Sequence, residues 1–196
     1  MQHKYYAVYK PYFVLSQFSS VEGKHCLKDF FTVEKDVYPV GRLDYDSEGL
    51  LILTNDTTLN HRLLHPRFVH EREYLAQVEG LVTEEAIQQL ETGVLINING
   101  NKYLTQPAHA IALDQPPLVP DRNPPIRVRK NIPDSWVRLI LTEGKNRQVR
   151  KMMAHTGFPV LRLIRCRIEN ISLRDMLPGD MKTVSKPTIY SQLFGK

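Results

Sequence analysis

The sequence predicts an α+β fold in which helices and loops flank a mixed, mostly antiparallel sheet. Strand-like and helix-like segments are interspersed along the 196 residues, and the strand spacing indicates hairpins as well as crossovers. The hydrophobic fraction of 42% and the charged fraction of 24% are typical of a globular protein. A chain of this length can bury about 70% of its unfolded surface, so a single domain over residues 1–196 is expected.

Each expected element follows from a local pattern. Strands are expected where apolar residues alternate or run together, namely at 4–9, 50–54, 72–80, 94–98, 104–113, 136–144 and 160–168. Helices are expected at 26–31, 57–64, 84–91 and 146–155, and the last ten residues are expected to form a short appendage. The helix at 84–91 has the clearest signals, because Thr83 can cap it, Glu84 and Glu85 occupy its first turn and Gly93 follows its end.

Two features of the composition exclude whole classes of protein. The two cysteines, Cys26 and Cys166, are far apart and form no CxxC pair, which excludes a disulfide scaffold and a cysteine-built zinc site. The N-terminal residues lack the basic and long apolar regions of a signal peptide, and no stretch approaches the roughly 18 apolar residues of a membrane span. We therefore expect a cytoplasmic protein with no membrane partner.

The positive charge is concentrated in one part of the chain. The net charge is +5, yet residues 121–170 alone hold twelve basic and four acidic side chains, so the remainder is slightly acidic. Most of these basic residues are arginines, whose planar guanidinium suits bidentate contact with phosphate. A solvated basic face would look similar, but this asymmetry favours a polyanionic partner, with nucleic acid the leading candidate.

A proline-rich stretch over residues 115–133 lies inside this basic region. Its six prolines oppose regular structure, and four basic residues lie between its positions 122 and 130. Two interpretations remain open: a stiff connector, or an arginine-bearing loop that contacts RNA.

Three local motifs carry the candidate chemistry. The first is GRLDYDSEGL at 41–50, an acidic loop framed by glycines that leads into a buried strand. The second is Arg72-Glu73-Tyr74 at the head of a strand, and the third is EGKNRQVRKM at 143–152, where a turn leads into a helix whose N-terminus suits an anion. Taken alone, an acidic loop is more often a turn that caps its own backbone.

A metal site is a weaker interpretation of the acidic loop. Asp44, Asp46 and Glu48 alternate as in a calcium loop, but the glycine at the sixth position and the bidentate Glu at the twelfth are absent. His61 and His65 are four residues apart on an expected helix without an evident third ligand, so surface histidines are expected there. The sequence thus predicts no metal.

In combined order and spacing, these motifs resemble the RsuA-like branch of the pseudouridine synthases. The resemblance also includes GFPVLRLIR at 157–165 and extends over about residues 4–180. It implies the pseudouridine synthase catalytic fold. Because the catalytic pattern begins at KYYAVYKP, we expect no room for the S4-like domain that most of this branch carries.

The segment RNPPIRVRKNIPDSW at 122–136 is similar to the ribosomal large subunit pseudouridine synthase E group within this branch. That similarity implies 23S ribosomal RNA as the partner, either naked or in an assembling particle, and we expect a monomer. The implied reaction detaches uracil from ribose, rotates it and rejoins it through C5. Since this is an isomerisation, the resemblance implies no cofactor.

The resemblance also implies roles for individual residues. Asp44 matches the catalytic aspartate, which acts either as a nucleophile at the sugar or as a base and electrostatic partner. Arg150 is expected to pair with Asp44 and keep it ionised, and Tyr74 to pack on the target base and to assist proton removal from C5. Leu163 or Ile164 is expected to form an apolar floor under the uracil.

The remaining expected contacts are with the RNA. The target base must leave the stacked helix, and Arg42 is expected to fill the gap or hold the flanking phosphate. Sequence-independent affinity for the RNA backbone is expected from arginines at six positions: Arg122, Arg127, Arg129, Arg147, Arg162 and Arg165. Arg72 replaces a lysine that the family often has, so it is left out of the catalytic set. Asp46 and Glu48 are expected to be solvated or capping residues.

Three alternatives remain at this point. The chain could be a non-catalytic ribosome-assembly or RNA-binding protein that keeps the fold. It could be a metal-dependent phosphodiesterase that uses Asp44, Asp46 and Glu48, or a family member that modifies a different RNA.

Overall fold

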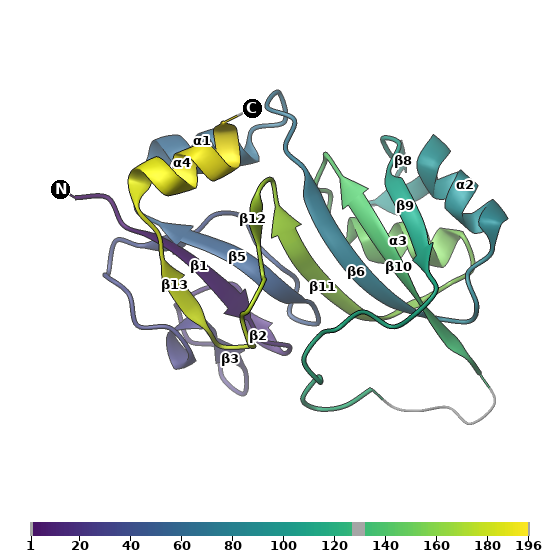
Figure 1. Ribbon diagram of the computed structural model, residues 1–196, viewed down its shortest axis with the longest axis horizontal. Helices are drawn as coiled ribbons and strands as arrows, with labels where there is room; N and C mark the ends of the chain where they lie inside the picture. Colours follow the sequence, from purple (N-terminus) through teal and green to yellow (C-terminus); the bar gives the residue numbers. More distant parts are fainter. Residues whose placement is uncertain (1, 127–131, 196) are drawn as a thin grey trace. The chain divides into compact units, whose positions relative to one another are not determined.

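The computed structural model describes residues 2–126 and 132–195, which form two compact units (Figure 1). Unit 1 comprises Met1–His70 and Ile164–Lys196, and unit 2 comprises Glu71–Leu163. Within the described residues, no helix has the length and apolar character needed to cross a membrane.

Unit 1 is built on a mixed sheet. Its strands are β1 (Tyr5–Lys10), β4 (Tyr38–Pro39), β5 (Glu48–Thr54), β12 (Ile171–Ser172), β13 (Met181–Thr183) and the part of β11 (Val160–Ile168) from Ile164 onward. β1 lies between β13 and β5 and is antiparallel to both. β5 runs parallel to β11, with Ile164 opposite Glu48 and Arg165 opposite Gly49. The expected mixed sheet is thereby confirmed.

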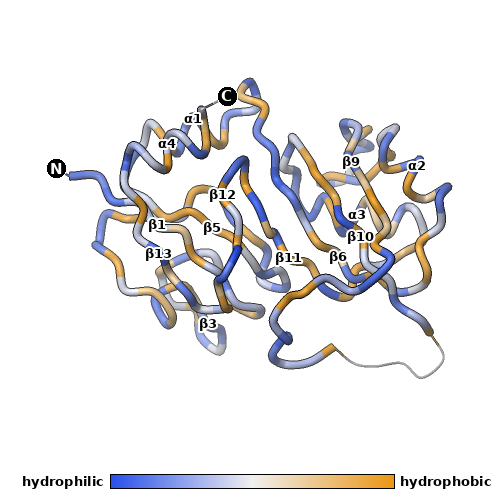
Figure 2. The backbone as a smooth tube through the Cα atoms, in the orientation of Figure 1, coloured by the Kyte–Doolittle hydropathy of each residue, from blue (hydrophilic) through white to orange (hydrophobic). Residues whose placement is uncertain are grey.

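Both faces of β5 are buried, and its side chains alternate between two apolar clusters. Leu50 and Ile52 contribute to a cluster with α1 (Thr57–Leu64) and α4 (Lys186–Phe194). Leu51 and Leu53 contribute to a second cluster, formed with the segment between β1 and β4. That segment contains the short strands β2 (Val14–Leu15) and β3 (His25–Cys26) and the 3-10 turn η1 (Leu27–Asp29). The hydrophobic colour along β5 in Figure 2 reflects this two-sided burial.

The last residues differ from the appendage expected from the sequence, because they form helix α4. The Ser185 hydroxyl caps this helix by accepting a hydrogen bond from the backbone of Thr188. Ile189 and Leu193, four positions apart, are buried in the cluster shared with α1. Residues at this spacing lie on one face of a helix. The sequence therefore contained a helical signal here, but it consisted of a single pair of apolar residues.

Unit 2 is an antiparallel sheet with two helices. Three of its strands pair in the order β6 (Arg72–Glu79), β10 (Asp134–Leu141) and β9 (His109–Leu113). A separate hairpin is formed by β7 (Leu95–Ile98) and β8 (Asn101–Leu104), and the helices are α2 (Glu84–Thr92) and α3 (Gln148–His155). Apolar side chains from these strands and helices form one core cluster.

Most expected elements of unit 2 are confirmed within a few residues, but one strand was missed. The expected strand at 104–113 corresponds to β9, and β8, which ends at Leu104, is the strand that was not expected. β8 pairs with β7 across a two-residue turn at Asn99 and Gly100, which both have positive φ. An Asn-Gly pair is the usual signal for such a hairpin turn, so the sequence contained the information.

Candidate active site

The acidic loop that contains Asp44 is held at the residues on either side of it. The Ser16 hydroxyl donates to the Leu43 carbonyl oxygen (2.8 Å) and accepts from the Leu43 N–H (3.0 Å). On the other side, the Phe13 N–H donates to the Tyr45 carbonyl oxygen at 3.0 Å. Both anchors come from the segment after β1, so Asp44 is partly exposed yet has fixed backbone neighbours.

A buried lysine lies in the electrostatic field of this loop. The Lys10 side chain is inaccessible to solvent, and its ammonium donates to the carbonyl oxygens of Pro11 (2.9 Å) and Val14 (2.7 Å). Burial lowers the pKa of Lys10 to about 7, while the carboxylates of Glu48, Asp44 and Asp46 act in the opposite direction. The lysine therefore fixes the segment that anchors the loop and supplies a nearby cation for its acids.

Sequence reasoning missed Lys10, Ser16 and Phe13. Lys10-Pro11 marked only the end of a strand, and the sequence carried no signal for contacts between residues about 30 positions apart. Glu48 also differs from expectation, because it is a buried residue of β5 rather than a solvated one.

Gly49, the residue after Glu48, permits the close approach of β5 and β11. Gly49 has φ +120°, and a Cβ built there would lie 2.4 Å from the Arg165 carbonyl oxygen. Arg165 is buried, and its Nε donates to the Leu50 carbonyl oxygen at 2.9 Å. Its Nη2 is also buried and has no hydrogen-bond partner among the described residues. Because this nitrogen is inaccessible to solvent, an RNA contact by Arg165 stays a prediction.

Tyr74 lies on β6 of unit 2, opposite Leu139 of β10. It is half-buried and packs against the core cluster of this unit, to which Leu163 belongs. Ile164, the next residue of β11, instead lies opposite Glu48 in unit 1. The choice between these two residues as the floor under the base stays a prediction.

The turn before α3 is organised by polar contacts. The Gln148 side chain accepts from the Lys145 N–H (2.8 Å) and donates to Glu143 (2.6 Å), and Glu143 in turn accepts from Gln106 N–H (2.9 Å). Arg147 has a left-handed conformation (φ 51°), which starts the helix at Gln148 rather than at residue 146.

Arg150 follows on the first turn of α3, and its Nη1 donates to the Val160 carbonyl oxygen at 3.2 Å. The expected pairing of Arg150 with Asp44 stays a prediction, since Asp44 belongs to unit 1 and Arg150 to unit 2. The other expected site residues are divided in the same way. Unit 1 contains Arg42, Ile164 and Arg165, and unit 2 contains Tyr74, Arg147, Arg162 and Leu163.

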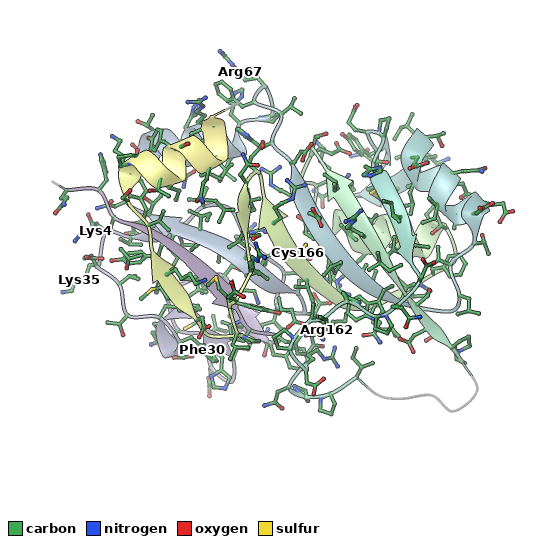
Figure 3. The ribbon with its side chains drawn as sticks, in the orientation of Figure 1. Lys4, Phe30, Lys35, Arg67, Arg162 and Cys166 are labelled. Atoms are coloured by element: carbon green, nitrogen blue, oxygen red, sulfur yellow. The ribbon has the colours of Figure 1, made fainter. Side chains whose placement is uncertain are left out.

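Two of the arginines expected to contact RNA hold the proline-rich stretch. Arg162, labelled in Figure 3, is buried and donates to the Pro120 carbonyl oxygen at 2.7 Å. Arg122 donates to the carbonyl oxygens of Pro124 (2.8 Å) and Pro125 (3.1 Å). These contacts support the connector interpretation, and an RNA contact by either arginine stays a prediction. Arg127 and Arg129 lie outside the described residues.

Among the described residues, no group of three or more His, Cys, Asp and Glu side chains is arranged to hold a metal ion. His61 and His65 contact each other with ring centroids 5.1 Å apart, and both pack near Phe68. The described part of the chain therefore offers no support for a metal-dependent phosphodiesterase.

Comparison with known proteins decides the family. The sequence profile of the RNA pseudouridylate synthase family matches residues 4–155, which include Asp44, Tyr74 and Arg150. The chain belongs to this family. It is accordingly an isomerase that acts on RNA, as the motifs implied.

Individual relatives agree with this assignment. The ribosomal large subunit pseudouridine synthase E of Vibrio vulnificus (strain CMCP6) is 45% identical over 179 residues, which cover 91% of this chain and 74% of the relative. The protein of the same name from Xanthomonas axonopodis pv. citri (strain 306) is 48% identical over 171 residues, which cover 86% and 87%. A solved pseudouridylate synthase structure superposes with a TM-score of 0.79 at 26% identity, covering 98% of this chain and 74% of that one. The expected pseudouridine synthase fold is thus confirmed.

Proposed function

We propose that this enzyme converts a uridine of 23S ribosomal RNA, in the large subunit, to pseudouridine, with Asp44 as its catalytic carboxylate. The observation that carries the proposal is the 44–48% identity, over most of the chain, to relatives named ribosomal large subunit pseudouridine synthase E. The net positive charge supports a polyanionic substrate. Because its substrate is ribosomal RNA, the enzyme is expected to act in the cytoplasm.

The reaction requires a carboxylate that is held in place and reachable by a nucleoside. Asp44 meets both requirements, because its neighbours Leu43 and Tyr45 are hydrogen-bonded to Ser16 and Phe13 while Asp44 itself is partly exposed. In the proposed reaction the C1′–N1 bond of the uridine breaks and a C1′–C5 bond forms. The proton lost from C5 is balanced by one gained at N1, so no external reactant is consumed.

The other roles follow the family pattern. Tyr74 packs on the uracil and assists removal of the C5 proton, and Arg150 pairs with Asp44. Arg42, which is exposed at the start of the acidic loop, fills the space that the flipped base leaves or holds the flanking phosphate.

The test compares the pseudouridine content of large-subunit RNA after reaction with the wild type and with Asp44→Asn. The variant should form no detectable product while it retains the wild-type fold and RNA affinity, because the amide cannot act as an anionic nucleophile or base.

Asp36→Asn is the matched control, since Asp36 is exposed and its carboxylate accepts a hydrogen bond from the Asn55 side chain. Undiminished product from Asp44→Asn would refute the catalytic assignment. A wild-type protein that binds this RNA without isomerising it would favour the non-catalytic assembly protein instead.

A further inference from the structure

Three aromatic rings stack beside the loop that carries Asp44. Phe13 is common to two stacked pairs: its ring centroid lies 4.0 Å from that of Tyr12 and 5.1 Å from that of Tyr45, at interplanar angles of 29° and 17°. Phe13 is 38% exposed, and the other two residues are partly exposed. We call these three residues the aromatic stack. All of them belong to unit 1.

The backbone under the aromatic stack is sterically unfavourable for its sequence. Phe13 has φ 56°, in the left-handed region that an aromatic residue rarely adopts. The conformation is held by the Phe13 N–H bond to Tyr45 and by the Lys10 ammonium, which bonds the carbonyl oxygens of Pro11 and Val14 on either side. Residues held in such strained conformations cluster at active sites and ligand-binding sites.

A cationic side chain lies over one end of the aromatic stack. The Lys24 ammonium is 5.3 Å from the Tyr45 ring centroid, and Lys24 is exposed. Because the Lys24 side chain is long and solvated, it can move off the Tyr45 ring or turn toward an anion. A planar apolar ligand that carries a negative charge fits this combination of ring and cation.

The position of the aromatic stack indicates which ligand that is. Tyr45 follows Asp44 directly, so their Cα atoms are about 3.8 Å apart, and both lie within the reach of two neighbouring nucleotides of one strand. Proteins recognise unpaired RNA bases by stacking them on aromatic side chains, and every base offers a π face for this contact.

We propose that the aromatic stack is a platform for an unpaired base next to the target uridine, with Tyr45 as the contacting ring. Lys24 then moves from the ring to the phosphate of the same nucleotide. The inference rests on the proposed function, because it requires that Asp44 receives a uridine from RNA. It adds a nucleotide subsite that holds the substrate strand when the uridine is extruded.

The first test measures kcat and KM on large-subunit RNA transcripts for Tyr45→Leu and Tyr45→Phe. Loss of the ring should raise KM about five- to 150-fold, the range that loss of one base–aromatic stacking contact produces, with kcat changed less than about threefold. Tyr45→Phe keeps a ring and should retain most of the affinity. Tyr38→Leu is the matched control, since Tyr38 is 60% exposed and lies opposite Thr54, at the other end of β5 from Glu48. A folded Tyr45→Leu with wild-type KM overturns the proposal.

The second test uses Lys24→Gln, an exposed change that is suited to a binding measurement even if Tyr45→Leu fails to fold. Removing one phosphate contact should lower the slope of log K against log salt by about 0.7 for single-stranded RNA. An unchanged slope, together with an unchanged dissociation constant, would overturn the phosphate contact and with it the proposed nucleotide subsite.

The two proposals fail in different ways. Dissociation constants are measured without turnover, so a wild-type enzyme that binds the transcript but forms no pseudouridine would refute the proposed function alone. Normal product formation by the wild type, with Tyr45→Leu and Lys24→Gln unaffected in binding, would refute the aromatic platform alone. Once the modified uridine is mapped, 2-aminopurine placed next to it should be quenched by the wild type and not by Tyr45→Leu.

Discussion

The hydroxyl of Ser16 is bonded twice to Leu43, as donor to its carbonyl oxygen and acceptor from its N–H. This reciprocal contact resembles one rung of a strand pair, although it is made by a side chain. It ties the segment after β1 to the residue before Asp44. The proposed catalytic carboxylate therefore owes its placement to a serine 28 positions earlier in the chain.

We predict that Ser16→Ala lowers kcat more than it changes KM. The buried Leu43 groups lose their partner, which costs about 1–3 kcal/mol of stability, and misplacing a catalytic group by about 1 Å can reduce the rate 100-fold. Steady-state kinetics well below the melting temperature measure the effect. Ser20→Ala, an exposed change in the same segment, should leave both constants unaltered. An unaltered kcat in folded Ser16→Ala would show that the contact only stabilises the protein.

We predict that Lys10 makes stability depend on pH above neutrality. Its pKa is about 7 in the folded protein and 10.5 ordinarily, so between these values the unfolded chain binds more protons. The unfolding free energy of the wild type should therefore rise, relative to Lys10→Met, as the pH increases from 7 toward 10, and the difference should be constant below about pH 6.

Urea denaturation of both proteins across this range is the measurement. Lys35→Met serves as the control, because Lys35 is exposed (Figure 3) and its curve should run parallel to that of the wild type. Parallel curves for wild type and Lys10→Met would contradict the predicted burial of the charge.

We predict that Tyr190→Phe weakens the attachment of α4 to unit 1. The hydroxyls of Tyr190 and Tyr5 donate to the same Asp56 oxygen at 2.8 and 2.7 Å. Burial works to raise the pKa of Asp56, but these two bonds and the Leu59 N–H outweigh it and lower the pKa. Losing one bond to a charged group should cost about 1.5–3 kcal/mol at pH 7.

The depressed pKa of Asp56 sets the sign of the pH effect. Its contribution to stability is present above the ordinary value of 3.8 and is lost as the pH falls through the folded value, so the loss in Tyr190→Phe should shrink in acid. Thermal unfolding at pH 7 and pH 3 tests this. Tyr38→Phe makes the same change at an exposed tyrosine and should be neutral. An equal loss at both pH values would assign the effect to packing.

Helices with local signals were predictable from the sequence. The helix at 57–64 was expected with the correct bounds, and the structure shows the Asp56 side chain capping it by accepting hydrogen bonds from the N–H groups of Thr58 and Leu59. Thr83 likewise caps α2 as expected. Capping and amphipathic spacing involve residues within one or two turns, so the sequence displays them directly.

The remaining features depend on residues that are distant in the chain. β8 and α4 had only short local signals, namely the Asn99-Gly100 turn and the apolar pair Ile189 and Leu193. By contrast, nothing near Lys10 or Phe13 indicated a buried ammonium or an aromatic stack, because both are created when the segment after β1 folds onto the acidic loop.

The sequence by itself determined the family, the α+β class and the candidate residues Asp44, Tyr74 and Arg150, because motif order and local periodicity are written along the chain. Only the tertiary structure decided how Asp44 is held, with Ser16 and Phe13 on its flanking residues and Lys10 behind them. The physical reason is that these buried hydrogen bonds and ring contacts join residues that are far apart in the chain. Such contacts depend on three-dimensional packing and produce no periodic pattern in the sequence.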